Sequence, residues 1–92
     1  MGFLQWPVKD SNEVLDYVLD WSARLDTGDA IASSTWIVPS GITKDSDNFG
    51  GSTTTIWLSG GTDGETYTFT NRITTDDGRT MDQSVRLRLK IK

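Results

Sequence analysis

The stretch from Thr66 to Ile91 constrains the fold most strongly, because it consists of two alternating runs joined by a short turn sequence. Alternation of apolar and polar side chains with a period of two indicates a strand that buries one face. The buried faces are expected to hold Tyr67, Phe69, Asn71 and Ile73 in the first run, and Met81, Val85, Leu87, Leu89 and Ile91 in the second. Segment 76–79 between the runs reads DDGR, and Asp-Gly is typical of hairpin turns. The sequence therefore predicts an antiparallel hairpin.

Three earlier segments alternate in the same way and are expected to be strands, namely 14–21, 31–38 and 53–58. In the first, the predicted inward side chains are Leu15, Tyr17, Leu19 and Trp21, with Asp16, Val18 and Asp20 outward. In the second, Trp36 and Val38 are expected to share a face with the small residues Ala32 and Ser34, opposite Ser33, Thr35 and Ile37. Clusters of glycine, proline and aspartate between these segments predict turns.

The remaining segments are less regular. Residues 1–9 are expected to form an N-terminal arm or an edge strand, since Pro7 lacks the N–H that a strand ladder requires. Asp10 followed by Glu13 matches a capping box, which predicts one turn of helix at a corner. Segment 42–52 is expected to be a long polar loop, with Ile42 at the start of a short edge strand.

These elements predict an all-β fold. No segment has the period of an amphipathic helix that would cover a sheet, so the inner faces of two sheets must cover each other. We therefore predict one domain over residues 1–92, an antiparallel β-sandwich of about six to seven strands. A small OB-like or SH3-like barrel is the alternative arrangement.

The composition argues against several classes of function. The chain has no Cys and no His, which removes thiol nucleophiles, disulfides, cysteine zinc sites and the commonest general base. Its net charge of −4 disfavours binding to nucleic acid, which requires a basic surface. The first residues, MGFLQWP, match neither a secretory signal nor a membrane span. We expect a soluble protein made in a cytoplasm, without enzymatic activity, cofactor or metal.

A glycine-rich turn followed by Tyr67, near the start of the penultimate strand, resembles the tyrosine corner of immunoglobulin-like and fibronectin type III domains. In that corner the phenol hydroxyl binds backbone upstream and holds the crossing between the sheets. The resemblance implies an immunoglobulin-like, fibronectin type III-like sandwich, with Tyr67 in a structural role and Trp21 or Trp36 as the core indole. The alternative is that Tyr67 is an ordinary inward-facing strand residue.

Several short motifs of the sequence, in order and at matching spacing, also resemble those of a group of small phage and prophage proteins. They are WPxKD from Trp6, VLDY from Val14, DWS from Asp20, IASSTW from Ile31, TIWLSGG from Thr55 and YTFTNRI from Tyr67. Proteins of this group are described as fibre-like or structural and are encoded among the head and tail morphogenesis genes of tailed phages. The resemblance implies a non-enzymatic immunoglobulin-like module in or on the virion, or in the bacterial cytoplasm when expressed from a prophage. Its implied partners are other phage structural proteins.

Charged stripes are expected on two outer strand faces. Arg86, Arg88, Lys90 and Lys92 form a basic stripe on the last strand, and Asp16 and Asp20 form an acidic one on an earlier strand. One interpretation is that charge protects an edge strand from aggregation. The other is that stripes of opposite sign meet between subunits and steer self-association.

Trp57 is a further candidate interface residue. It faces outward if Ile56 and Leu58 face inward, and an exposed indole beside Thr55 suits a protein or sugar contact. The reversed register would place Trp57 in the core. An outward Trp57 supports the alternative function, a carbohydrate- or cell-surface-binding accessory module with a surface glycan as partner.

Two acidic groupings suggest chemistry without meeting its requirements. Segment 45–50 (DSDNFG) partly matches an EF-hand calcium loop, but Phe49 replaces an oxygen ligand and Ile56 stands where a bidentate Glu is needed. The possible acid–base carboxylates are Asp76 and Asp77 with Asp82, or Asp16 with Asp20. The last pair would lie roughly 13 Å apart along a strand, too far for a shared task. We expect these groups to be solvated surface charge.

Overall fold

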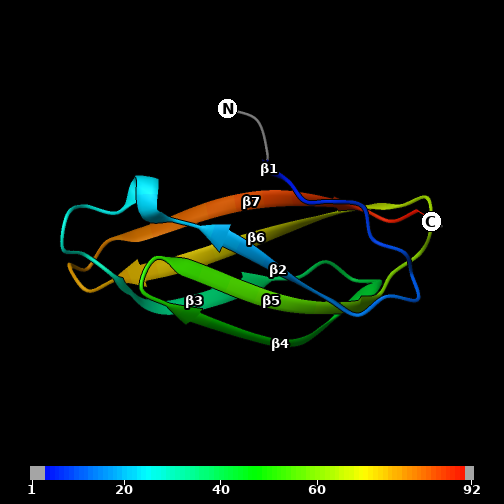
Figure 1. Cartoon of the computed structure of the whole chain (residues 1–92), viewed down its shortest axis with the longest axis horizontal. Helices are drawn as coiled ribbons and strands as arrows, with labels where there is room; N and C mark the ends of the chain where they lie inside the picture. The colour runs from blue at the N-terminus through cyan, green and yellow to red at the C-terminus, as the bar shows by residue number, and fades with distance from the viewer. Residues whose placement is uncertain (1–3, 91–92) are drawn as a thin grey trace.

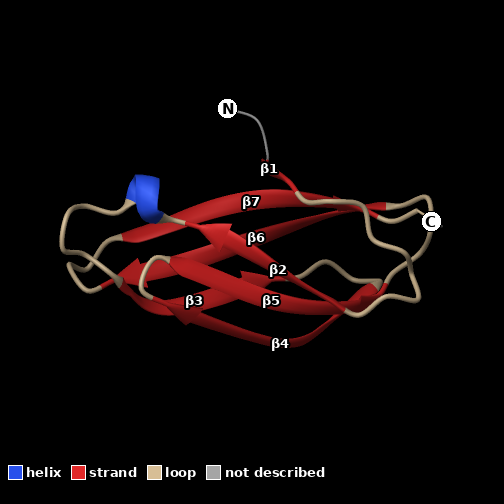
Figure 2. Ribbon diagram, viewed as in Figure 1, coloured by secondary structure: helices blue, strands red, loops and turns tan. Residues whose placement is uncertain are grey.

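The computed structural model describes residues 4–90. Within this range the chain forms seven strands and a 3-10 turn at Ser22–Arg24, and strands fill most of Figure 2. The strands are β1 (Leu4–Gln5), β2 (Leu15–Asp20), β3 (Ile31–Ile37), β4 (Ile42–Gly50), β5 (Thr53–Gly60), β6 (Thr66–Thr75) and β7 (Thr80–Arg88). The many threonines favour this outcome, because their stiff branched side chains suit strands better than helix interiors.

The strands form two sheets that pack face to face. One has the order β1-β7-β6-β3 and the other β2-β5-β4. In Figure 1, β2 and β5 lie in front of β6 and β3. The orders β2-β5-β4 and β3-β6-β7 match the B-E-D and C-F-G orders of a constant-type immunoglobulin domain. The predicted all-β, immunoglobulin-like sandwich is therefore confirmed over the small barrel.

The predicted hairpin is formed by β6 and β7. Their register pairs Thr66 with Arg88 at one end and Thr74 with Thr80 at the other. The DDGR turn closes it, with the Thr75 N–H donating to the Arg79 carbonyl at 2.8 Å. The side chains expected to face inward are buried, except that Met81 is only partly buried and Ile91 lies outside the described residues. Alternation alone was sufficient to orient this hairpin.

Segment 42–52 was wrongly predicted to be a loop, since Ile42–Gly50 is strand β4. It pairs antiparallel with β5 along its whole length, with a register shift between Lys44 and Ser46. As the edge strand of the three-stranded sheet, β4 exposes most of its side chains. An exposed strand held by backbone hydrogen bonds needs no apolar alternation, so its sequence resembles a polar loop.

Strand β3 corrects the expected position of Ala32. Pairing with β6 shifts register between Ile31 and Ser33, as a β-bulge does. The irregularity leaves Ile31 buried and Ala32 exposed, whereas simple alternation would place Ala32 beside Trp36 on the inner face. From Ser34 onward the prediction holds, with Trp36 buried and Ile37 exposed.

The predicted helical turn at the first corner is instead a hydrogen-bonded β-turn. The Glu13 N–H donates to the Asp10 carbonyl at 3.0 Å, and the Glu13 carboxylate accepts from the Asp10 N–H at 2.8 Å. The Asp10 carboxylate also accepts from the Asn12 N–H. The capping-box contact thus forms without a helix, because β2 begins two residues later.

The arm before this corner contributes to the core. Residues 4–9 run alongside β7, where β1 pairs in parallel, and the Trp6 N–H donates to the Arg86 carbonyl. The Trp6 ring stacks on Tyr17 of β2 with centroids 4.7 Å apart, and it contacts Trp36 and Phe69 at 5.8 Å each. An arm that was expected to be peripheral therefore fills the space between the sheets.

Candidate functional site

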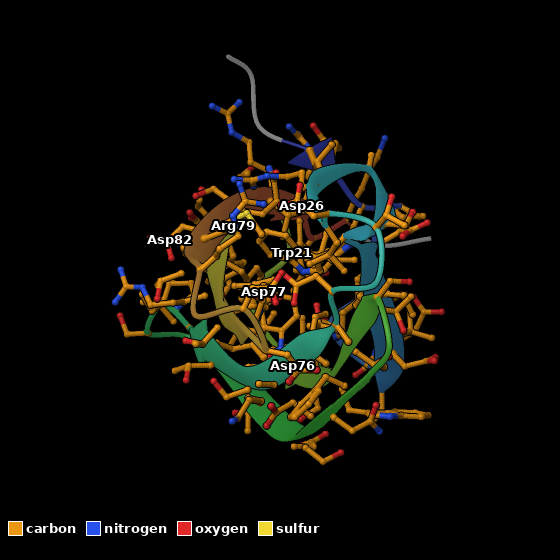
Figure 3. All side chains as sticks on the ribbon, turned by 90° about the vertical axis from the view of Figure 1, so that its left-hand side faces the viewer. Trp21, Asp26, Asp76, Asp77, Arg79 and Asp82 are labelled. Atoms are coloured by element: carbon orange, nitrogen blue, oxygen red, sulfur yellow. The ribbon has the colours of Figure 1, made fainter. Side chains whose placement is uncertain are left out.

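Trp21, labelled in Figure 3, directly follows the end of β2 and belongs to a buried polar network. Its indole N–H donates to Asn71 Oδ1 at 3.0 Å and contacts Thr54 Oγ1 at 3.3 Å. The Thr54 hydroxyl donates to the same Asn71 oxygen at 2.6 Å, and Asn71 Nδ2 donates to Ser34 Oγ and the Thr35 carbonyl. This Asn71 network, formed by Trp21, Ser34, Thr35, Thr54 and Asn71, joins both sheets.

Asn71 is the residue whose role sequence reasoning missed. It was placed on the inner face of its strand, but no partner was foreseen. The side chain is fully buried, at 0 % exposure, and each of its two polar groups has two contacts. Burying an amide without partners is costly, so a lone Asn on an apolar strand face signals such a network.

Trp36, the other candidate core indole, is buried against Trp6 instead. Its Nε1 has no hydrogen-bond partner among the described residues. The two indoles therefore differ, since Trp21 makes polar and apolar contacts while Trp36 contributes apolar packing.

Tyr67 makes the contact expected of a tyrosine corner. Its hydroxyl accepts a hydrogen bond from the Thr62 N–H, five residues upstream, at 3.0 Å. Gly41 lies beneath the ring, and a Cβ there would stand 3.3 Å from both the ring edge and the hydroxyl. Gly41 also has a φ of +97°, which disfavours any other residue at that position.

Lys9 is a second residue that the sequence did not single out. The side chain is at 0 % exposure, and Nζ donates to the carbonyls of Asp10 and Gly60 at 2.9 Å each. Burial lowers the pKa of Lys9, an effect that the nearby carboxylates of Glu13, Asp10, Asp63 and Asp45 oppose. The contact ties the N-terminal arm to the end of β5.

The predicted basic stripe is exposed on the outer face of the four-stranded sheet, where Arg86 and Arg88 stand opposite Thr68 and Thr66 of β6. Lys90 is also exposed, just beyond β7, and Lys92 lies outside the described residues. The interpretation that the basic stripe protects an edge strand from aggregation does not hold, because β7 lies between β6 and β1. Beyond β1, the Lys9 N–H donates to the Arg88 carbonyl and the Lys90 N–H donates to the Lys9 carbonyl, so the N-terminal arm pairs with the chain as far as Lys90. We call this surface the basic face.

The opposite side of the sandwich has an acidic and apolar surface. Trp57 faces outward on β5, with its side chain 38 % exposed, while Ile56 and Leu58 are buried. The register places Asp16 of β2 directly across from Trp57. Four further residues on the outer side of these strands are Val14, Val18, Asp20 and Thr55. We call this surface the acidic face.

The other carboxylates are dispersed or paired. Asp82 accepts two hydrogen bonds from Arg72, at 2.8 and 3.0 Å, which hold the pKa of Asp82 below its usual range. Figure 3 shows Asp76 and Asp77 near the hairpin turn and Asp82 off to one side. The structure therefore does not bring these three aspartates together as an acid–base set.

Segment 45–50, which partly matches a calcium loop, lies within β4. Its carboxylates contact protein groups, since Asp47 pairs with Lys44 at 2.8 Å and Asp45 accepts from Ser59 at 3.0 Å. Among residues 4–90, no cluster of three potential metal ligands is found. In the same range, no helix is long and apolar enough to cross a membrane.

The chain matches the family model described as podophage GP4 fiber-tail adaptor protein gp77 over residues 9–88. It belongs to that family. The match spans both sheets except β1, and the chain is therefore a phage structural protein of a small fibre-related family. The predicted resemblance to small phage fibre-like proteins is thereby confirmed. No match was found among curated proteins.

Proposed function

We propose that this protein is a connector of the phage tail that joins a fibre to the tail through protein–protein contacts, without catalysis. The observation that supports this best is the family match over residues 9–88. A connector must present at least two surfaces to different neighbours. Besides the basic face and the acidic face, which belong to different sheets, the sandwich exposes edge strand β4 and the turns at both ends, so it has several separate surfaces.

The fold suits this role physically. A connector must transmit force between partners without changing shape, and two sheets sharing a packed core form a rigid unit. Here the Asn71 network adds side-chain hydrogen bonds that link the sheets directly. We infer that the chain is one domain and a virion component, made in the bacterial cytoplasm before assembly.

The proposal is tested by deleting the gene in its phage and examining purified particles. We expect mass spectrometry to detect the chain in wild-type virions, and we expect deletion particles to retain tails but lose fibres. Complementation with the wild-type gene should restore the fibres. A chain absent from virions, or deletion particles with normal fibres, would contradict the connector role.

A second function, binding of a carbohydrate on the cell surface, has one observation in its favour. Trp57 is exposed and has polar residues across from it on both neighbouring strands, Asp16 on β2 and Ser46 on β4. An indole face beside hydrogen-bonding groups suits a sugar ring. Glycan-array binding that is lost in Trp57→Ala and retained in Phe49→Ala, which alters another exposed aromatic, would support this function.

A further inference from the structure

The acidic face combines carboxylates with an exposed apolar group. On its β2 side, Val14 is 57 % exposed and Val18 is 50 % exposed, and Trp57 lies on the neighbouring strand across from Asp16. Exposed apolar residues are common singly, but a group of them bordered by charge marks a protein contact surface. The Ser22 N–H donates to the Asp20 carboxylate and holds the pKa of Asp20 below its usual range.

The basic face has complementary chemistry. Arg88 stands opposite Thr66 and Arg86 opposite Thr68, so two arginines and two threonines share the outer side of this strand pair. An arginine side chain is suited to stack on an indole while pairing with a carboxylate. The basic face therefore provides partners for both Trp57 and the aspartates.

The spacing of the charges also agrees. Same-face residues on a strand recur roughly every 6.7 Å, so Asp16 and Asp20 lie roughly 13 Å apart. Arg86 and Lys90 are separated by the same number of residues and have about the same separation if the extended backbone continues past β7. Two stripes of equal period and opposite sign can align along their length.

We propose that the acidic face of one molecule binds the basic face of a second copy of this chain. Because the two surfaces are different patches, the contact is heterologous, and repeating it produces a ring or an open stack. Complementary charge steers the approach, and Trp57 with its two valines supplies the apolar centre of the contact. This proposal concerns the isolated chain and does not rest on the tail role.

The test measures the molar mass of the purified chain by sedimentation velocity, from micromolar to millimolar concentration. We expect the mass to rise with concentration at low salt and to fall toward the monomer as salt screens the charges. A wild-type chain that stays monomeric under all these conditions would overturn the proposal, and the two faces would then be assigned to other proteins.

Paired variants then identify the surfaces. D16N/D20N removes the acidic stripe, and R88Q/K90Q removes part of the basic one. Each should weaken self-association at least tenfold. An equimolar mixture should form one-to-one dimers and nothing larger, because each variant retains one intact face that fits the other's. A mixture in which both variants remain monomeric would overturn the pairing of these two faces.

Two controls separate surface effects from folding and net charge. E65Q/D76N makes the same change in net charge as D16N/D20N at exposed turn residues, and it should associate like the wild type. Thermal unfolding followed by circular dichroism should give similar midpoints for all variants. Equal weakening by E65Q/D76N would show that net charge alone drives association, which contradicts a specific contact.

Discussion

At one end of the sandwich, Trp21 reaches across to Asn71, while at the other end Lys9 reaches the backbone of Gly60 and Tyr67 reaches the backbone of Thr62. Both ends contain buried polar groups that link distant segments. The first end does so mainly with neutral side chains that bind one another. The second does so with side chains that bind backbone in turns and in the N-terminal arm.

The difference predicts how strongly substitutions at each end should destabilise the fold. In the Asn71 network every member depends on the same amide, so its loss would leave several buried groups without partners. At the second end the contacts are separate, and the Lys9 ammonium bears a desolvation cost that its two carbonyl partners offset. We therefore expect larger and less additive effects at the first end.

The largest effect is expected from Asn71→Ala. It leaves the Trp21 indole N–H and the hydroxyl of Thr54 without their Asn71 contact, and the free energy of unfolding should fall by about 3 kcal/mol. Urea denaturation monitored by tryptophan fluorescence measures this loss. Thr68→Ala, an exposed change on the same strand, should cost about 0.5 kcal/mol or less. Equal losses in both variants would contradict the central role of the amide.

A smaller loss is expected at Lys9. Lys9→Ala removes the ammonium and the buried stem, and should cost about 2 kcal/mol. Lys9→Met keeps most of the apolar volume and also removes the desolvation cost, so it should recover about half of that loss. Thermal unfolding of both variants decides the point. A methionine variant as unstable as the alanine variant would mean that the hydrogen bonds, rather than packing, dominate this contact.

Tyr67→Phe should cost about 1 kcal/mol, because it removes the bond to Thr62 and leaves the ring in place over Gly41. Hydrogen exchange of the Thr62 amide should also become faster, which reports the loss locally. If neither the unfolding midpoint nor the Thr62 exchange rate changes, the corner contact contributes nothing measurable.

At neutral pH the smallest effect is expected from Tyr17→Phe, because the Tyr17 hydroxyl has no hydrogen-bond partner among the described residues. Burial raises the pKa of Tyr17 from 10.0 to about 12, so the neutral phenol is favoured in the folded state. Its contribution to stability is complete below pH 10 and is lost as pH rises from about 10 to 12. Alkaline unfolding monitored by circular dichroism should therefore occur at a higher pH in Tyr17→Phe than in the wild type. An unchanged profile would show that other groups govern alkaline unfolding.

Individual elements show where sequence reasoning succeeded and failed. The β6–β7 hairpin was predicted because its inner face is apolar and its turn contains Asp-Gly. Strand β4 was missed because it lies at a sheet edge, where backbone pairing with β5 suffices and exposed side chains are unconstrained. The inner position of Ala32 failed because a bulge changes the face of a residue without changing its sequence pattern.

The candidate surfaces divide in a similar way. Strand period correctly placed Asp16, Arg88 and their neighbours outward, since alternation is a local property of the chain. The edge position assumed for β7 was wrong, because covering by the N-terminal arm depends on a segment far away in sequence. The outward orientation of Trp57 was left open between two registers, and the burial of Ile56 and Leu58 against the other sheet decides it.

By itself, the sequence determined that this protein is all-β and favoured a two-sheet sandwich over a small barrel, because period-two alternation and turn chemistry act over a few residues and need no knowledge of the fold. It also contained the short motifs by which the chain resembles its phage family. Tertiary structure alone decided that Lys9 and Asn71 are buried with partners and that Trp6 fills the core. These outcomes depend on groups brought together from distant segments, and burial of a polar group is favourable only where such partners meet it.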